Sequence, residues 1–178
     1  MSETPQIVET YSLKLRFPTI EDASAIFEQY ARDKQVTKYM TWQPHHNIET
    51  TQQFLQQSIE DLTAKNYYLW VILPIEKKKA IGMIRLQCYN YRAELGYVLA
   101  RHYWNQGLMT EALQPLVNWA ITQPDIYRVW AVCDCENLAS ARVLEKVGMT
   151  REGILRRWLL HPNLSDEPRD CFCYAKVK

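Results

Sequence analysis

The segment from Trp104 to Ala112, WNQGLMTEA, places a glycine directly before a run with helical spacing of apolar residues. The first N–H groups of a helix have no partner inside the helix, and the aligned peptide dipoles make that end positive. Gly107 carries no side chain, so backbone amides there can approach a bulky anion. The segment therefore predicts either a phosphate-binding loop or an ordinary strand-to-helix turn.

A second strand-to-helix segment runs from Cys133 to Met149. Asn137 has a side chain typical of a helix N-cap, and Gly148 is a natural stop at the other end. Ser140 lies in the first turn, where a serine is often no more than a plain helix residue. The spacing of the two segments, rather than either one alone, indicates a shared site.

Together the two segments resemble the GNAT superfamily of N-acetyltransferases. The opening LKLRFPTIEDA (13–23) and the stretch NLASARVLEKVGM (137–149), followed by Glu152-Gly153, are similar to its RimJ/RimL-like branch. Members of that branch acetylate N-terminal amines of ribosomal proteins. The resemblance covers about Glu9 to Val177 and implies one N-acetyltransferase domain, residues 9–177.

The resemblance implies an α/β acyl-CoA N-acyltransferase fold, with a mixed, mostly antiparallel central sheet flanked by helices. Its fourth and fifth strands, here Glu94–Ala100 and Tyr127–Cys135, run parallel and splay apart, and acetyl-CoA enters between them. Backbone groups on the fourth strand would pair with the pantetheine amides like an added strand. The residues that the resemblance assigns to acetyl-CoA are Val98 and Leu99 for pantetheine, Trp104, Asn105, Gln106, Gly107, Leu108, Met109 and Thr110 for the pyrophosphate, Asn137 for the pantetheine arm and Arg142 for the phosphorylated end.

Two loop positions depart from the family pattern Gln/Arg-x-x-Gly-x-Gly/Ala. Trp104 replaces a cationic or amide side chain, and Met109 crowds a place usually kept small. The backbone N–H groups remain. We therefore expect amides rather than side chains to hold the pyrophosphate.

The implied reaction is direct attack of a neutral amine on the thioester carbonyl. An α-amine with a pKa of ~7.8 is roughly a tenth neutral at pH 7, whereas a lysine at ~10.4 is neutral only a few times in ten thousand. A protein N-terminus therefore needs a weaker base than a lysine side chain does. The branch implies a ribosomal protein as the acceptor. A carboxylate acting through water would suffice.

Glu94 begins the predicted fourth strand, where many family members have a glutamate general base; the alternative is a carboxylate paired with Arg85 or Arg92. His161, at the tip of the predicted last hairpin, is the outside candidate for this role. Glu111 fits a structural role instead, because negative charge in the first turn suits the helix dipole.

For the acid that protonates the leaving thiolate, Ser140 matches a serine of the branch. The superfamily often has a tyrosine in this helix, and Leu144 occupies that position here. A CoA thiol resembles cysteine, with a pKa of ~8.5, so it leaves readily as the thiolate and depends less on an acid.

Two Cys-x-Cys pairs, Cys133/Cys135 and Cys171/Cys173, lie in predicted strands, and a period of two puts each pair on one face. If the last strand lay beside the fifth, four thiols could converge on zinc. Structural zinc sites usually present their cysteines on turns, so buried free thiols and no metal are expected. Cys133 is expected near the cofactor's sulfur, where oxidation could join it to CoA.

An irregular segment is predicted at 33–47. It holds Tyr39, Trp42, His45 and His46, which form either part of the acceptor side or an aromatic packing segment.

Two other functions are weighed against N-terminal acetylation. Acetylation of a polyamine or aminoglycoside would favour an acidic cleft, which Glu94, Glu21, Asp22 and Glu49 would form if they converged. A non-catalytic CoA-binding sensor would account for the missing tyrosine and the altered loop.

Hydrophobic periodicity predicts the elements that must position these groups. The order β-α-α-β-β-β-α-β-α-β-β indicates an α/β protein with a mixed sheet. Thr19 is expected to cap the first helix, with Asp22 in the capping-box position. The predicted strands are 11–17, 67–73, 79–88, 94–100, 127–135, 149–160 and 169–177, and the predicted helices are 20–32, 48–64, 107–121 and 138–147.

The bulk composition bounds these interpretations. With 178 residues, 47% of them hydrophobic, and a net charge of +1, the chain suits one domain and not a nucleic-acid binder that relies on bulk charge. No secretory signal is seen, and no apolar stretch approaches the ~20 residues of a membrane helix. We expect a cytoplasmic monomer or homodimer, in which the five cysteines are free thiols.

Overall fold

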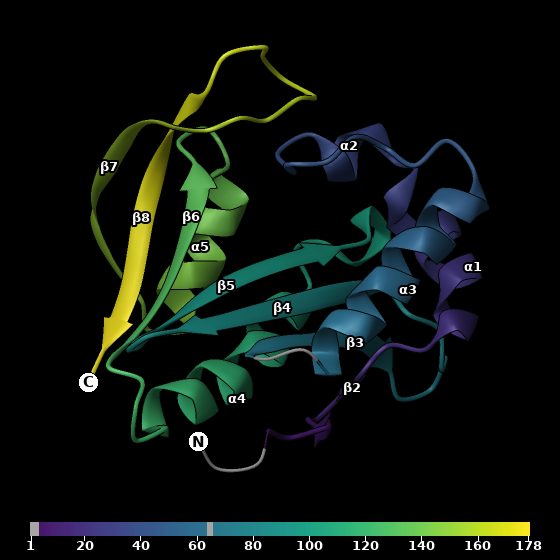
Figure 1. The fold of residues 1–178 in the computed structure, drawn as a ribbon, viewed down its shortest axis with the longest axis horizontal. Coiled ribbons are helices and arrows are strands. Elements are labelled where there is room, and N and C mark those ends of the chain that lie inside the picture. The colour runs from purple at the N-terminus through teal and green to yellow at the C-terminus, as the bar shows by residue number, and fades with distance from the viewer. Residues whose placement is uncertain (1–3, 64–65) are drawn as a thin grey trace.

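The computed structural model describes residues 4–63 and 66–178, and its strands form one eight-stranded sheet in the order β1-β2-β3-β4-β5-β6-β8-β7 (Figure 1). Neighbouring strands are antiparallel except β5 and β6, which are parallel. The predicted α/β fold with one parallel pair is confirmed. The strands are β1 (Ile7–Glu9), β2 (Leu13–Arg16), β3 (Tyr67–Pro74), β4 (Gly82–Tyr89), β5 (Arg92–Leu99), β6 (Arg128–Asp134), β7 (Thr150–Leu159) and β8 (Arg169–Val177).

The helical segments follow the predicted order, with additions near the N-terminus. The predicted first helix consists of three consecutive short pieces, a 3-10, an α and a π segment. The predicted end of the second helix, Ala64, lies outside the described residues. The helical segments are η1 (Ile20–Asp22), α1 (Ala23–Ile26), η2 (Phe27–Ala31), α2 (Lys34–Thr37), α3 (Ile48–Thr63), η3 (Arg101–Tyr103), α4 (Leu108–Thr122) and α5 (Leu138–Lys146).

Three short elements were missed, namely α2, β1 and the 3-10 segment η3. The segment 33–47 is not wholly irregular, because Asp33 caps α2 by accepting a hydrogen bond from the Gln35 amide at 2.8 Å. β1 has only three residues, too few to show an alternation in the sequence, and it is defined by its pairing with β2.

The capping predicted at Thr19 is confirmed, since its amide donates to Asp22 at 2.9 Å, and Arg16 holds the same carboxylate from the other side.

The parallel pair β5–β6 is joined over three residues only. Arg92–Glu94 pairs with Arg128–Trp130, after which β5 continues along β4 and β6 continues along β8. The two strands diverge beyond this point (Figure 1). We call the space between Leu95–Leu99 of β5 and Ala131–Asp134 of β6 the wedge. Backbone groups that face the wedge do not pair across it, so an extended ligand can pair with them.

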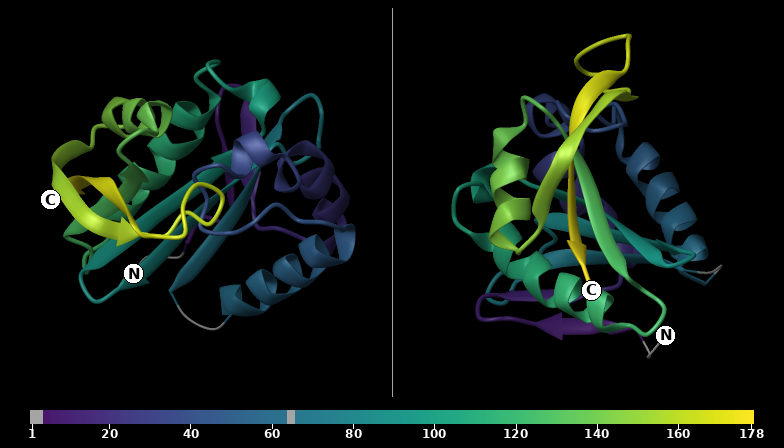
Figure 2. Two further views of the ribbon diagram at one scale, coloured as in Figure 1. Left: turned by 90° about the horizontal axis from the view of Figure 1, so that it is seen from above. Right: turned by 90° about the vertical axis from the view of Figure 1, so that its left-hand side faces the viewer.

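The sheet is covered on both faces by helices, with α3 on one face and α4 and α5 on the other (Figure 2). On the α4–α5 face, Leu95 and Leu99 pack in one core with residues such as Leu116. On the α1–α3 face, Val71 and Met83 pack in a second core with side chains from α1 and α3. Because side chains alternate along β5, Tyr97 packs against the first core and Val98 against the second.

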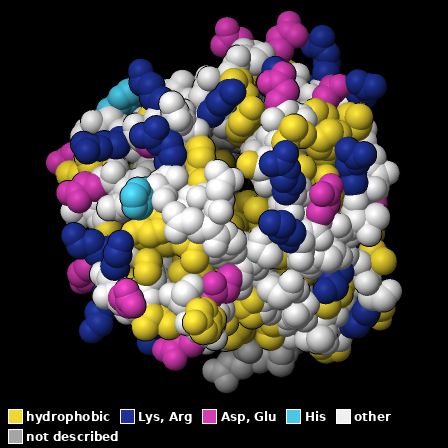
Figure 3. Space-filling model, turned by 180° about the vertical axis from the view of Figure 1, so that it is seen from behind, with side chains coloured by type: hydrophobic (Ala, Val, Ile, Leu, Met, Phe, Trp, Pro, Cys, Tyr) yellow, Lys and Arg dark blue, Asp and Glu magenta, His cyan; other side chains and the backbone are white. Residues whose placement is uncertain are grey.

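The surface opposite to that in Figure 1 carries charges of both signs, interspersed with hydrophobic and uncharged groups (Figure 3). Among residues 4–63 and 66–178, no helix is both long and apolar enough to cross a membrane.

Candidate active site

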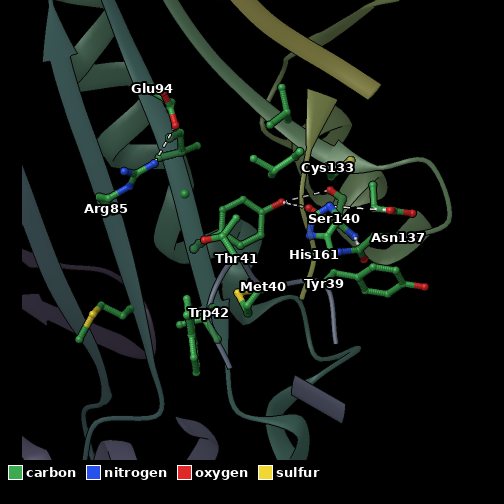
Figure 4. A pocket seen from close by; sticks show the side chains of 18 of the residues that line it. Tyr39, Met40, Thr41, Trp42, Arg85, Glu94, Cys133, Asn137, Ser140 and His161 are labelled. Carbon is green, nitrogen blue, oxygen red and sulfur yellow. Dashed lines mark hydrogen bonds and ion pairs between the residues drawn. The ribbon is translucent and has the colours of Figure 1, made fainter. Parts of the chain in front are cut away.

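A cavity of about 770 Å³ occupies the wedge and opens toward both faces of the sheet (Figure 4). β5 lines it with Gly96, Tyr97 and Val98. β6 lines it with Val132, Cys133 and Asp134, and further lining residues come from η2, α3 and α5. The wedge therefore connects the α4–α5 side of the sheet, where a cofactor can lie, with the α1–α3 side.

The N-terminus of α4 is open to an anion. Gly107 is its N-cap, with φ of +78° and no side chain to cap the helix. The first bond within the helix joins the Glu111 amide to the Gly107 carbonyl at 3.0 Å, so the amides of Leu108, Met109 and Thr110 precede it. Asn105 also has a positive φ, +59°, and both Asn105 and Gly107 are exposed. This geometry suits a phosphate group.

The two unusual loop residues have structural contacts. The indole N–H of Trp104 donates to the Leu99 carbonyl at 2.7 Å and ties the loop to the end of β5. Met109 is 5% exposed and lies in the core, so it does not crowd the loop. Gln106 donates from its side chain to the His102 carbonyl at 2.8 Å. The predicted pyrophosphate residues 104–110 do not line the wedge cavity; they lie just past the end of β5.

A pair of hydroxyl groups spans the wedge on the α4–α5 side. Tyr97 of β5 and Ser140 of α5 have oxygens 2.7 Å apart, and the phenol also reaches the Ser140 carbonyl at 3.2 Å. The Asn137 side chain accepts from the Ser140 amide at 3.2 Å, which is the N-cap contact, and both residues line the cavity. Burial raises the pKa of Tyr97 and raises that of Cys133 to about 12, so both groups stay protonated and uncharged at neutral pH.

Tyr97 was missed by the sequence reasoning, which looked for a phenol at Leu144. Leu144 is fully buried in the core. Tyr97 interrupts the leucines on its face of β5, at 95 and 99, and this polar atom among apolar neighbours was the available signal.

Glu94 is the last residue of β5 that pairs with β6, at the vertex of the wedge. Its carboxylate accepts from the Arg85 guanidinium at 2.7 Å and from the Tyr89 hydroxyl at 3.1 Å. Gly96 lies opposite Arg85 on the neighbouring strand, and an added Cβ would make only an ordinary contact with the guanidinium, 3.5 Å from Nε. Glu94 therefore faces the cavity as an ion-paired carboxylate (Figure 4).

The α1–α3 side of the cavity has an aromatic wall, which consists of Tyr39, Trp42, His45 and Phe54. The rings of Trp42 and His45 lie 5.2 Å apart, and those of His45 and Phe54 6.1 Å apart. Asn163, in the β7–β8 loop, donates to the carbonyl of Trp42 at 2.8 Å and also to that of Thr37. The loop thus braces the wall. His46 does not line the cavity.

The acidic cleft predicted from Glu21, Asp22 and Glu49 is not formed. None of the three lines the cavity, and Asp22 is buried against Arg16. The two carboxylates that line it, those of Glu94 and Asp134, are each paired with an arginine.

Arg142 lies apart from the α4 loop. It lines a small second pocket between α5, β7 and β8, together with Arg151 and Tyr174.

Three of the four cysteines of the Cys-x-Cys pairs are buried and all are free thiols. In the part of the chain that the structure describes, no three His, Cys, Asp or Glu side chains are grouped to hold a metal ion.

Residues 12–150 match the acetyltransferase (GNAT) domain, so the chain belongs to the GNAT family. The uncharacterized N-acetyltransferase YoaA of Bacillus subtilis is 31% identical over 97% of each chain. The spermidine N(1)-acetyltransferase of Escherichia coli is 23% identical over 82% of this chain and 76% of its own length.

Solved structures agree on the fold. An acetyltransferase of the GNAT family from Bacillus anthracis is 26% identical, with a TM-score of 0.82 over 96% of this chain and 98% of its own. The microcin C7 self-immunity acetyltransferase, in complex with acetyl-CoA and AMP, is 24% identical, with a TM-score of 0.86 over 98% of both. A ribosomal-protein-S5-alanine acetyltransferase from Vibrio fischeri is 21% identical, with a TM-score of 0.82 over 96% of both. The chain is thus an enzyme of the N-acetyltransferase class, and the GNAT family takes its acetyl group from acetyl-CoA.

Proposed function

We propose that this N-acetyltransferase, through a functional unit of residues 9–177, acetylates the α-amine of a protein N-terminus. The observation that carries the proposal is the acceptor side of the cavity, which has an aromatic wall and where, among the residues that the structure describes, each lining carboxylate is paired with an arginine. A polyamine carries several positive charges and would gain from unpaired carboxylates. A single α-amine needs only one polar contact and is partly neutral at pH 7.

Acetyl-CoA would lie along the wedge. The pantetheine amides would pair with backbone groups of Val98 and Leu99, and the arm would pass Asn137. The pyrophosphate would lie on the amides between Trp104 and Thr110, and Arg142 would reach for the phosphorylated end from α5. No metal is required, because the amides and the helix dipole supply the positive potential.

In the proposed reaction the amine nitrogen attacks the thioester carbonyl, and the C–S bond breaks as the C–N bond forms. Glu94 takes a proton from nitrogen through a water molecule. Ser140 protonates the departing thiolate and is reprotonated through Tyr97, whose oxygen is 2.7 Å away. General acid–base catalysis of this kind contributes about 10²- to 10⁴-fold.

Acetylation of a small amine is the second candidate function. The similarity to a spermidine acetyltransferase favours small-amine acetylation. The fold shared with a ribosomal-protein acetyltransferase is compatible with N-terminal acetylation. The shape of the site admits both, so the acceptor must be identified by assay.

The test is release of free CoA thiol from acetyl-CoA with two acceptor panels, peptides with free N-termini and small amines that include spermidine. We expect turnover with peptides and little with spermidine. Preference for spermidine would overturn the acceptor assignment. Failure of acetyl-CoA to bind in calorimetry would overturn the cofactor site.

The role of Glu94 is tested by Glu94→Gln. We expect kcat to fall about 100-fold, because the amide cannot accept the proton, while KM for acetyl-CoA stays the same. Glu49→Gln, an exposed position off the cavity, is the matched control. An unchanged rate and pH profile in Glu94→Gln would rule Glu94 out as the base.

A further inference from the structure

His161 lines the cavity with a buried imidazole. The side chain is 2% exposed, lines the cavity and comes from the β7–β8 loop (Figure 4). Among the residues that the structure describes, its Nδ1 has no hydrogen-bond partner. A buried polar atom without a partner is costly, which suggests that a ligand completes this one.

The opposite edge of the imidazole faces a fixed carboxylate. His161 Nε2 lies 3.7 Å from Asp134 Oδ2. Asp134 also accepts from Arg169 Nε at 2.6 Å and from the Glu136 amide at 2.9 Å. Burial raises the pKa of Asp134, but these donors outweigh it and hold the pKa below its ordinary value, so the carboxylate is charged.

This arrangement makes Nδ1 the basic nitrogen of the imidazole. A carboxylate beside Nε2 favours the tautomer that carries its proton there, which leaves the Nδ1 lone pair free. The other groups that face the ring are the Cys171 thiol, 4.0 Å from Nε2, and the Tyr39 ring, at a centroid distance of 6.4 Å. Charge gained by the imidazole would be balanced by Asp134, which is shared with Arg169.

His161 lies on the acceptor side of the wedge. It packs edge-on against Tyr39 of the aromatic wall, and the same loop holds the wall through Asn163.

Two protons leave the acceptor nitrogen during the reaction. An acceptor ammonium carries three protons on nitrogen, and the product amide carries one. One proton leaves before the attack and one leaves afterwards, while the thiolate takes one up. A carboxylate that has accepted the first proton must release it before it can accept the second.

We propose that His161, positioned by Asp134, is a second proton-accepting residue, which takes the first proton from the acceptor ammonium. Glu94 then takes the second through water, and the first passes from His161 to solvent. The proposal rests on the proposed function only in requiring an amine acceptor, and it holds for peptides and small amines alike.

The pH dependence distinguishes this role from a structural one. With the imidazole present, an ammonium can be deprotonated after it binds, so the acid limb of the kcat/KM profile is not set by the pKa of the acceptor amine. In a variant without the imidazole, only the α-amine that is already neutral in solution reacts. The acid limb of the kcat/KM profile then moves up toward pH ~7.8, the pKa of the α-amine. A structural defect would lower the rate equally at every pH.

The experiment measures kcat/KM for a peptide acceptor from pH 6 to 9 in His161→Asn, with His46→Gln as an exposed histidine control off the cavity. We expect a loss of about 10- to 100-fold at pH 6.5 that shrinks above pH 8.5, with the acetyl-CoA affinity unchanged in calorimetry. His161→Ala should recover activity with added imidazole. A pH-independent loss without rescue, or an unchanged profile, would overturn the proposal, whereas a wild-type enzyme that is inactive on every amine would overturn the proposed function.

Discussion

The two sides of the wedge differ in what they present to a ligand. On the α4–α5 side the structure offers backbone amides at an uncapped helix N-terminus and the hydroxyl pair Tyr97–Ser140. On the α1–α3 side it offers aromatic and ionisable side chains, several of them from the segment after α2 and the β7–β8 loop. Apart from that hydroxyl pair, the first side is built from backbone groups that every residue has, whereas the second is built from side chains particular to this chain.

This difference explains how one fold can keep its cofactor and change its acceptor. Backbone amides and a helix dipole tolerate replacement of the side chains around them, as at Trp104 and Met109. An aromatic wall depends on the identity of each ring. Substitutions on the two sides should therefore affect different kinetic constants.

The largest effect is expected from a charge at the helix N-terminus. In Gly107→Asp a carboxylate would cap α4 and repel the pyrophosphate, so the affinity for acetyl-CoA should fall about 100-fold. The free energy of unfolding should fall by about 1 kcal/mol, because an L residue is strained at this positive φ. Calorimetry with acetyl-CoA and thermal unfolding would measure the two quantities.

Gly107→Asn is the matched control, since it has a similar shape without the charge. We expect it to lose about tenfold in affinity, because its side chain competes for the same amides. If the charged and neutral variants bind acetyl-CoA like the wild type, the pyrophosphate does not lie at this helix end.

A smaller effect is expected from the aromatic wall. Trp42→Ala removes the ring that packs at a tilt against His45, and KM for a peptide acceptor should rise about tenfold while KM for acetyl-CoA stays constant. Tyr127→Ala, an exposed aromatic off the cavity, serves as the control. A rise in both Michaelis constants would mean that the two sides are not separable.

The cofactor side was the more predictable of the two from sequence. Gly107 and Asn137 mark helix N-termini, and such local signals survive without knowledge of the tertiary structure. The fold class and nearly all elements followed from periodicity. The exceptions were β1, α2 and η3, each of three or four residues. β1 is defined by its pairing with β2, and α2 by the cap at Asp33.

The acceptor side could not be assembled in the same way. The pairing of His161 with Asp134 joins a loop to the end of β6, and the ion pair of Glu94 with Arg85 was only one of two alternatives. The acids at 21, 22 and 49 looked suitable by type but lie elsewhere. Asp134 did carry a signal, because a carboxylate in a buried strand must find a charged partner.

The smallest effect is expected from a substitution at Glu111. It tests whether a charge close to the N-terminus of α4 must act on the cofactor. Its carboxylate accepts from Thr10 Oγ1 at 2.6 Å and from the Ser12 amide at 2.7 Å, so it ties α4 to the β1–β2 turn. Glu111→Gln should lower the free energy of unfolding by about 1 kcal/mol at pH 7 and leave the acetyl-CoA affinity unchanged. Denaturant unfolding and calorimetry measure these two outcomes.

The pH dependence of that loss has a definite sign. Burial raises the pKa of Glu111, but the hydrogen bonds from Thr10 and Ser12 outweigh it and lower the pKa below its ordinary value. A carboxylate with a lowered folded-state pKa stabilises the fold above its unfolded pKa and loses this contribution as pH falls through the folded value. The difference between wild type and Glu111→Gln should therefore be constant at neutral pH and shrink below about pH 4.5. A difference that persists undiminished in acid would show that the carboxylate acts through packing, and a changed acetyl-CoA affinity would place Glu111 on the cofactor side of the comparison.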